Sequence, residues 1–362
     1  MTQRERQILR LIQSDPMISQ QALANHLGIT RSSVAVHISN LMRKGYIAGK
    51  GYVLPQSNSV VVVGGVNMDI GGRAFARPVP GDSNPGSISL SLGGVGRNIA
   101  HNLALLGTDV QFLTAFGEDV YGQRIMDSCA QLGIGVSHAL RRPDIATPTY
   151  LYIASDTGEM EMAISDMEGC KKITPEYLSG QLSLLQTAKV VVADANIPAD
   201  SLEYLAENCR SPLFCDPVST TKAQRLLPVL HKIHTLKPNR LEAEILSGVP
   251  IHSFADVEKA AQVLLEKGVQ RLFISLGKDG MYAASGQERL RLSNFPGKAV
   301  NTTGCGDAVM AALVWSYLEE YSLAQSAAAG LAAGAVAMES AETINPAMSA
   351  SAVRMRMGEE IV

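Results

Sequence analysis

Residues 301–313, NTTGCGDAVMAAL, run from a glycine-rich turn directly into an Ala-rich helical segment. The amides of residues 304–306 would lie at the start of that helix, where unpaired N–H groups and the helix dipole favour an anion. Asp307 could accept the proton of an attacking hydroxyl while these amides offset charge on a transferred phosphoryl group. The segment therefore predicts a base beside an anion hole formed by Gly304, Cys305 and Gly306. By spacing alone, it is equally typical of an ordinary glycine turn before a helix.

The chain has 362 residues, 46% of them apolar, which is enough for one large and one small domain with buried cores. It contains no apolar run near the roughly 18 residues that span a bilayer. Its five cysteines are scattered without CxxC spacing or histidine pairing, which argues against a disulfide framework or a zinc site. We therefore expect a soluble cytoplasmic protein with no membrane partner.

Residues 1–54 differ in charge from the rest of the chain. They carry seven Lys/Arg against two acids, whereas the remainder carries 24 against 32. Such asymmetry favours a nucleic-acid-facing end on an acidic body. Three helical patterns follow one another in this segment, and Ser19 and Thr30 are placed as N-caps of the second and third.

The third of these helices would present polar residues near its start. The stretch from Gly45 to Leu54 reads as a short hairpin after it, so residues 1–54 resemble a winged helix-turn-helix. The outward side chains that could reach bases in a major groove are those of Arg31, Ser32, Ser33 and His37. A small helical docking or dimerisation module is the alternative. Because operators are usually read as two half-sites by a dimer, DNA binding would imply a homodimer.

After a polar linker at residues 55–59, the remainder (60–362) alternates short β-branched runs with Ala/Leu-rich helical patterns. This rhythm predicts an α/β domain in which helices cover a parallel sheet, with ligands at the carboxyl ends of its strands. Two segments, 71–92 and 147–166, instead alternate like solvent-edged strands. They predict a small β lid over the cleft.

A second glycine-rich turn opens a helix in GGVGRNIAHNLALLGTDVQFLTAFG, residues 93–117. With NTTGCGD it matches the two signatures of the ribokinase, or PfkB, family of carbohydrate and nucleoside kinases, and the markers VNMD, KPNRLEAE and SLGKDG occur between them in order. The chain is therefore identified as a member of this family over roughly residues 58–350. The resemblance implies a three-layer αβα domain, an ATP-dependent kinase activity and Asp307 as the catalytic base.

The resemblance also implies roles for other residues. Asp69 and Asn98, with the backbone at Gly93 and Gly94, look like ligands of the acceptor's hydroxyls. Asn239 and Glu242 look like the pair that organises magnesium (Mg2+) and its waters beside ATP, which suits an ion that keeps several waters. The loop along the nucleotide would contain Ser275, Gly277 and Gly280. The chain has no GxxxxGK[ST] motif, so a Walker-type ATP site is excluded.

Two positions depart from the family pattern. Cys305 replaces the more usual alanine in the anion hole, where the family uses the backbone amide, so little loss is expected. Asn301 stands where many sugar kinases have an aspartate tied to a potassium site, and SAETINP (340–346) also differs there. These departures leave activation by a monovalent cation in doubt.

The strings SNPG (83–86), GEMEMAISDM (158–167) and DPVSTTK (216–222) look most like pseudouridine kinases within the family. This favours a nucleoside acceptor, with Thr149 and Asp166 of the lid as polar contacts, although both residues could serve sheet pairing alone. A free sugar is the alternative acceptor. A sugar phosphate would need a cluster of cations, for which the candidates are Arg73, Arg77, Arg97, Arg141 and Arg142. A regulator that only senses its ligand through a kinase-like body is the remaining alternative.

Overall fold

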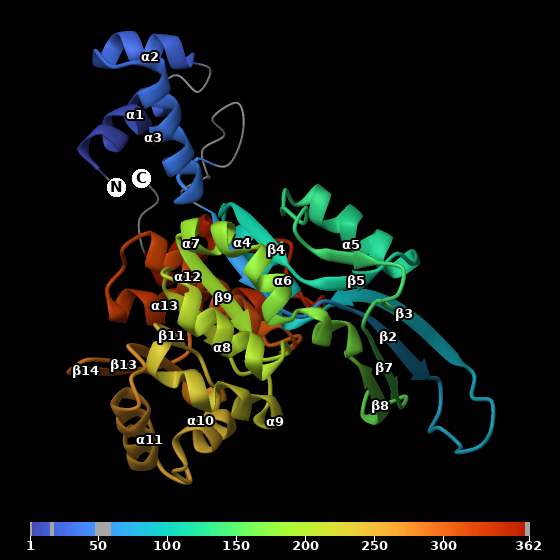
Figure 1. Cartoon of the computed structure of the whole chain (residues 1–362). Coiled ribbons are helices and arrows are strands. Elements are labelled where there is room, and N and C mark those ends of the chain that lie inside the picture. The colour runs from blue at the N-terminus through green and yellow to red at the C-terminus, as the bar shows by residue number, and fades with distance from the viewer. Residues whose placement is uncertain (1, 15–17, 48–58, 359–362) are drawn as a thin grey trace.

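The computed structural model describes residues 2–14, 18–47 and 59–358. Three N-terminal helices stand apart from the rest of the ribbon in Figure 1: α1 (Gln3–Ser14), α2 (Gln20–Leu27) and α3 (Arg31–Arg43). Their buried apolar side chains form a core of their own, drawn from residues 8–47. The predicted wing after α3 and the predicted linker lie outside the described residues, except for the first residues of the hairpin and for Ser59.

Local signals explain the helix boundaries in this domain. The side chains of Ser19 and Thr30 accept hydrogen bonds from backbone amides in the first turns of α2 and α3, which confirms both predicted N-caps. Gly28 ends α2 in the left-handed conformation, with φ of 61°. The buried carboxylate of Glu5 pairs with Lys44 at 2.8 Å and so joins α1 to the end of α3.

An eight-stranded sheet forms the centre of the large domain, in the order β14-β13-β12-β11-β10-β9-β1-β4. The six strands from β12 to β4 are parallel, as the βαβ rhythm predicts, and β13 and β14 add an antiparallel hairpin at one edge. Their bounds are β1 Val60–Val63, β4 Val110–Leu113, β9 Val190–Asp194, β10 Leu213–Asp216, β11 Thr235–Leu236, β12 Arg271–Ser275, β13 Met281–Ser285 and β14 Glu288–Leu292.

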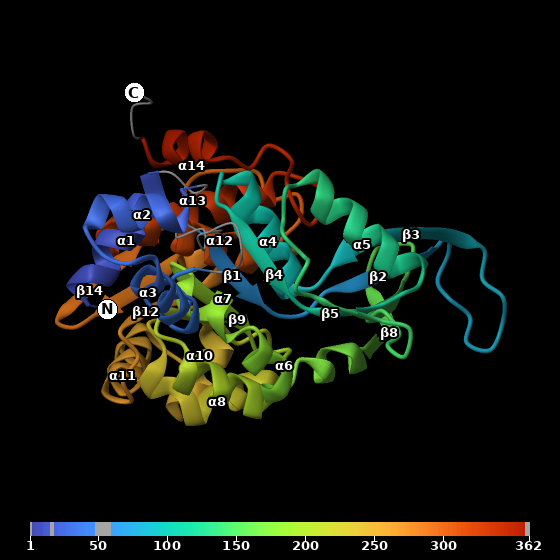
Figure 2. The ribbon, with the colours of Figure 1, turned by 45° about the horizontal axis from the view of Figure 1, so that its top comes forward.

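Helices cover both faces of this sheet (Figure 2). Side chains alternate along β1, so that Val60 and Val62 enter one apolar core while Val61 and Val63 enter the other. The first core contains α4 (Val95–Leu105), α5 (Val120–Gln131), α12 (Cys305–Leu318), α13 (Leu323–Met338) and α14 (Ala350–Met357). The second contains α6 (Pro175–Gly180), α7 (Leu182–Thr187), α8 (Ala199–Asn208), α9 (Thr220–Ala223), α10 (Arg240–Ser247) and α11 (Phe254–Glu266). This is the expected three-layer αβα arrangement.

A separate four-stranded sheet, in the order β3-β2-β7-β8, projects from the body in Figure 1. Its strands are β2 (Asn67–Ala74), β3 (Gly86–Gly93), β7 (Thr149–Ala154) and β8 (Met160–Asp166). The sheet confirms the predicted lid, although β2 begins at Asn67, before the predicted start at residue 71. A short pair, β5 (Ala115–Gly117) and β6 (Leu140–Arg142), and three 3₁₀ segments complete the fold.

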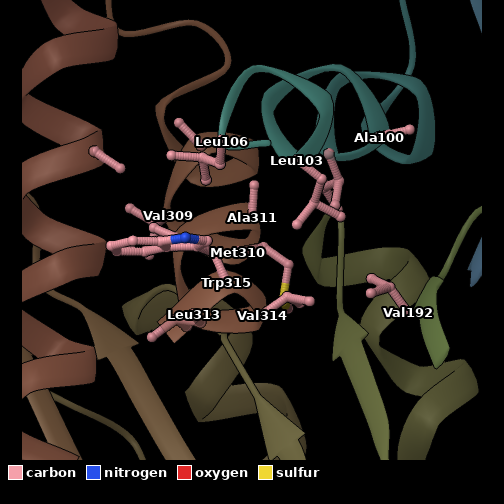
Figure 3. Packing of buried hydrophobic residues seen from close by; sticks show 14 of the residues in the cluster. Ala100, Leu103, Leu106, Val192, Val309, Met310, Ala311, Leu313, Val314 and Trp315 are labelled. Carbon is pink, nitrogen blue, oxygen red and sulfur yellow. The ribbon is translucent and has the colours of Figure 1, made fainter. Parts of the chain in front are cut away.

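Helix α12 is apolar on almost every side, and ten of its residues, from Asp307 to Ser316, are buried. In Figure 3 Met310 and Val314 of this helix lie on the side of Leu103 of α4 and Val192 of β9, and the Trp315 ring points to the other side of the helix. A helix that is hydrophobic all round is typical of a domain centre. The first turn of α12 is therefore held rigidly, and with it Asp307. Among the described residues, no helix has the length and apolarity to cross a bilayer.

Candidate active site

The start of α4 lies directly against the turn that follows β1. Gly94, the N-cap of α4, has φ of 97°, and a Cβ on it would come within 2.6 Å of the Gly65 carbonyl oxygen. A side chain at this position would therefore be both strained and obstructed. The Arg97 amide donates to the same carbonyl of Gly65 at 3.1 Å. These contacts fix the first turn of α4 and, through it, the position of Asn98.

Asn98 and Asp307 meet across the cleft although they are far apart in the chain. The Asn98 Nδ2 amide donates to Asp307 Oδ2 at 2.8 Å, and both residues are buried. The N-cap of α12, Gly304, has φ of 81°, and a side chain there would collide with the Thr343 carbonyl. The amides after Gly304 consequently open α12 beside the carboxylate, which is the arrangement that the sequence predicts for an anion hole and a base.

The carboxyl group of Asp307 titrates far from its ordinary range. Burial, reinforced by the nearby charge of Asp216, raises its pKa to about 8. The hydrogen bond from Asn98 and the charge of Lys237 act in the opposite direction. A carboxyl group with a pKa close to neutrality can take up a proton during turnover and release it again, as a general base must do.

Asp69 reaches the same cleft from the lid. It lies on β2 opposite Ser91 of β3, and its Oδ1 accepts a hydrogen bond from Asn67 Nδ2 at 2.6 Å. A Cβ on Gly93 would overlap the Asp69 carboxylate, so the glycine leaves room for it. Burial raises the pKa of Asp69, while the Asn67 hydrogen bond and the charge of Arg97 lower it. The carboxylate is thus positioned to accept hydrogen bonds from hydroxyl groups.

These residues line one cleft of about 1380 Å³ between the lid and the body. The predicted site residues that it brings together are Asp69, Gly94, Asn98, Gly304 and Asp307. His101, one turn after Asn98 on α4, also lines the cleft, and burial lowers its pKa to about 4, so the ring is neutral at physiological pH. Helical spacing from Asn98 is the sequence signal that could have pointed to it.

The predicted lid contacts Thr149 and Asp166 are not among the residues that line the cleft. They lie opposite each other in the β7–β8 pair, where Thr149 donates to the Thr147 carbonyl and Asp166 accepts from the Glu168 amide. The adjacent pair in the ladder, Tyr150 and Ser165, faces the cleft instead. Because side chains alternate along a strand, the two pairs point to opposite faces. The role predicted for Thr149 and Asp166 remains a prediction.

Asn239 and Glu242 form a capping box at the start of α10. The Asn239 side chain accepts from the Glu242 amide, and Glu242 Oε2 accepts from the Asn239 amide, both at 2.9 Å. Among the described residues, no three acidic, histidine or cysteine side chains gather as metal ligands. The second carboxylate oxygen of Glu242 has no hydrogen bond from a described residue. Such a sparse donor set fits an Mg2+ ion that keeps most of its waters.

The predicted nucleotide loop adjoins this pair. Ser275, at the end of β12, donates its amide to the Pro238 carbonyl and forms an isolated β-bridge with Asn239. Gly277 and Gly280 follow with φ of 60° and 88°, and a side chain at 280 would collide with the Leu292 carbonyl. Because Gly280 has no side chain, this turn can lie close to β14. Their contact with a nucleotide remains a prediction.

Three charged residues in the floor of the site lie outside the predicted set. Asp194 and Asp216 end the neighbouring strands β9 and β10, and Lys237 follows β11. The Asp194 Oδ2 accepts from the Gly65 amide at 2.8 Å and so ties β9 to the turn below α4. Lys237 Nζ lies 3.1 Å from Asp216 Oδ2, with both side chains buried. Their place at the ends of buried strands was the available sequence signal.

The arginines that could have formed a phosphate clamp do not converge. Arg97 lines the cleft, but its guanidinium donates to the Leu92 carbonyl and the Ser128 hydroxyl. Arg73 donates to the Asp156 carbonyl, and Arg142 pairs with Asp144. Arg141 donates to the Gln123 side chain. This arrangement gives no support to a sugar-phosphate acceptor.

In the N-terminal domain, the predicted DNA-contact residues occupy the first turns of α3. Arg31, Ser32 and Ser33 are exposed, and His37 is half-buried. Their exposure leaves the start of α3 available for a major groove, as a recognition helix requires. These contacts remain a prediction.

The three-layer fold, the β lid and the position of Asp307 at the glycine-capped start of α12 are typical of a sugar or nucleoside kinase, here with a helical domain in front. The model of the pfkB family of carbohydrate kinases matches residues 57–350, and a winged helix-turn-helix DNA-binding model matches residues 1–48. The chain belongs to the pfkB family of carbohydrate kinases.

Relatives match most of the chain. The uncharacterized sugar kinase YeiI of Escherichia coli is 43% identical, covering 97% of both chains. The pseudouridine kinase of Escherichia coli is 40% identical, covering 81% of this chain and 95% of its own. Among solved structures, a carbohydrate kinase from Agrobacterium tumefaciens superposes with a TM-score of 0.75 at 28% identity, covering 83% of this chain and 97% of its own.

Proposed function

We propose that this kinase transfers the γ-phosphoryl group of ATP to a hydroxyl of a nucleoside, with pseudouridine as the first candidate. The observation that carries the proposal is the 2.8 Å hydrogen bond between Asn98 and Asp307 in the cleft that Asp69 also lines. This contact, and the pKa of Asp307 at about 8, support Asp307 as the base and Asp69 and Asn98 as the groups that hold the hydroxyls of a ribose ring.

In the proposed reaction, the acceptor hydroxyl gives its proton to Asp307 as its oxygen attacks the γ-phosphorus. The new O–P bond forms as the bond to the β-phosphate oxygen breaks, and ADP leaves. The amides of residues 304–306 stabilise negative charge on the transferred group. Asp69 and Asn98 orient the acceptor. Mg2+, when bound near Asn239 and Glu242, would screen the charge of the phosphates.

Support for a nucleoside acceptor comes from two directions. The Escherichia coli relative at 40% identity carries the name pseudouridine kinase, and the strings at residues 83–86, 158–167 and 216–222 resemble that group. Tyr150 and Tyr152 line the lid side of the cleft, where an aromatic side chain can pack on a flat base.

A panel assay tests the acceptor. ATP consumption is measured with pseudouridine, uridine, inosine, guanosine, ribose and fructose 6-phosphate under matched conditions. The proposal expects the highest kcat/KM for a nucleoside. A sugar or a sugar phosphate as the best acceptor would overturn it.

We also propose that the N-terminal domain binds DNA, so that the protein regulates transcription as well as catalysing phosphorylation. The match to a winged helix-turn-helix and the exposed start of α3 support this. A regulator that senses ligand without catalysis would turn over none of the panel acceptors. Coupling between the two activities requires that saturating nucleoside and ATP change the affinity for DNA.

A homodimer and a cytoplasmic location complete the proposal. Two recognition helices are needed to read two half-sites. The lid face that points away from the cleft exposes Ile88, Met162 and Ile164, at 78%, 62% and 59%, which a second copy could cover. Light scattering should give the mass of two chains for the native protein and of one chain for Ile88→Glu. Val120→Glu, at an equally exposed apolar position on α5, should remain a dimer.

A further inference from the structure

A buried lysine stands against the start of the helix that carries the anion hole. Lys237 follows β11, and its side chain is only 7% exposed. Its Nζ lies 3.3 Å from the position that a Cβ on Gly306 would occupy. The absence of a side chain at Gly306 thus gives the ammonium room beside the first turn of α12.

Most of the hydrogen-bonding capacity of this ammonium is unused. Lys237 has three N–H donors, and among the described residues the structure gives it one partner, Asp216 Oδ2 at 3.1 Å. The other oxygen of Asp216 accepts from the Val218 amide at 2.9 Å. Burying an ammonium group whose one close described partner is a single carboxylate oxygen is costly unless a further anion reaches it.

The carboxylates around Lys237 indicate that this further anion is a phosphate of ATP. Its ammonium lies within the electrostatic reach of three carboxylates, Asp216, Glu242 and Asp307. These acids would repel the phosphates of ATP, which must nevertheless come between Asp307 and Glu242 for the reaction to occur. Lys237 interacts electrostatically with both Asp307 and Glu242. It is therefore placed to bridge the base and the proposed metal site.

We propose that Lys237 is a catalytic residue whose ammonium binds the transferred phosphoryl group beside the Gly306 amide. The inference rests on the proposed kinase function. On transfer, the ammonium keeps its three protons and offsets the charge that spreads over the equatorial oxygens of the phosphoryl group. Asp216 orients it through the ion pair.

The alternative role is purely structural, with Lys237 serving only to balance Asp216. The variants Lys237→Met, Lys237→Arg, Asp216→Asn and the double variant Asp216→Asn/Lys237→Met separate the two. The double variant removes both members of the buried ion pair, so it should fold even where Lys237→Met does not. Thermal unfolding of each variant reports on folding.

Binding of AMP-PNP and of AMP, both with Mg2+, is measured by calorimetry beside turnover of the best panel acceptor. We expect Lys237→Met and the double variant to bind AMP-PNP about tenfold more weakly and AMP unchanged, because AMP lacks the terminal phosphates. Their kcat should fall about 100-fold. Lys237→Arg, which keeps the charge, should lose less.

A double variant that matches the wild type in AMP-PNP affinity and kcat would overturn the inference and leave Lys237 as a structural partner of Asp216. Equal weakening of AMP and AMP-PNP would also overturn it. A wild-type protein that does not bind AMP-PNP would instead overturn the proposed function itself.

Discussion

The Asn98 amide donates to the Asp307 carboxylate at 2.8 Å, so the residue proposed to orient the acceptor also holds the proposed base. The two residues come from the first turns of α4 and α12, which pack against each other in the same apolar core (Figure 3). Acceptor binding and proton transfer are thereby coupled through one side chain.

Asp307→Asn should lower kcat by about 10²- to 10⁴-fold, because the amide cannot accept the proton of the acceptor hydroxyl. AMP-PNP affinity should change little. Steady-state kinetics and calorimetry measure the two quantities. The matched control is Asp127→Asn, an exposed carboxylate on α5, which should behave as the wild type. Unchanged kcat in Asp307→Asn would remove this residue from the role of base.

Asn98→Ala should raise the KM for the acceptor and destabilise the fold by about 1 to 3 kcal/mol, since it leaves the buried Asp307 carboxyl without its partner. The Asn98 hydrogen bond lowers the pKa of Asp307. Its loss should therefore move the acidic limb of the kcat/KM profile to higher pH. An unshifted limb would mean that the hydrogen bond does not act on the base.

Activity should depend on pH through Asp307, whose pKa is about 8. The base acts when deprotonated, so kcat/KM should rise about tenfold per unit below pH 8 and level off above it. Initial rates between pH 6 and pH 10, with ATP and Mg2+ saturating, measure this limb. A flat profile between pH 6 and pH 8 would contradict the assignment.

The same group predicts a trend in stability. The folded pKa of about 8 exceeds the ordinary value of 3.8, so the folded state holds a proton that the unfolded state loses between these values. Asp307 therefore destabilises the wild type progressively as pH rises from about 4 to about 8. The Tm of Asp307→Asn relative to the wild type should increase across this window. A constant difference would show that Asp307 has an ordinary pKa.

Arg31→Ala should weaken DNA binding by the N-terminal domain. If Arg31 neutralises one phosphate, the slope of log affinity against log salt concentration should decrease by about 1. Fluorescence anisotropy with a labelled duplex measures this slope. Arg124→Ala removes the same charge from an exposed position on α5 and should leave the slope unchanged.

Regular patterns in the sequence predict most of the fold. Consecutive valines at 60–63 indicate a strand buried on both faces, and the structure divides them between two cores. The Gly304 turn before an apolar helix likewise indicates the predicted anion hole, because the pattern lies within one short stretch of sequence. The β13–β14 hairpin is less visible, because its place at a sheet edge depends on long-range pairing rather than on the local pattern.

Sequence reasoning missed parts of the site for two reasons. It does not fix which face of a strand points to the cleft, and it does not show that a charged residue is buried. One position along β7 decides whether Thr149 or Tyr150 faces the cleft, and alternation alone does not fix which face is inward. Lys237 reads as a solvent-exposed lysine because lysine is rarely buried. The structure places its Nζ against Gly306 in the first turn of α12, and the local sequence carries no sign of this contact. Asn239 and Glu242 stand three residues apart, and this spacing is typical of a helix capping box as well as of the predicted magnesium pair.

Among the described residues, the N-terminal core draws on none beyond 47, whereas the proposed base, Asp307, follows Asp69, Asn98 and Lys237 in the chain. During synthesis on the ribosome, the small domain can therefore fold long before the enzyme can exist. A translation product that stops within the large domain would retain the DNA-facing helix and lack catalysis. Such a fragment, if it ends before the lid, would carry the proposed recognition helix without the lid face that we propose for dimerisation, so it would read at most one half-site.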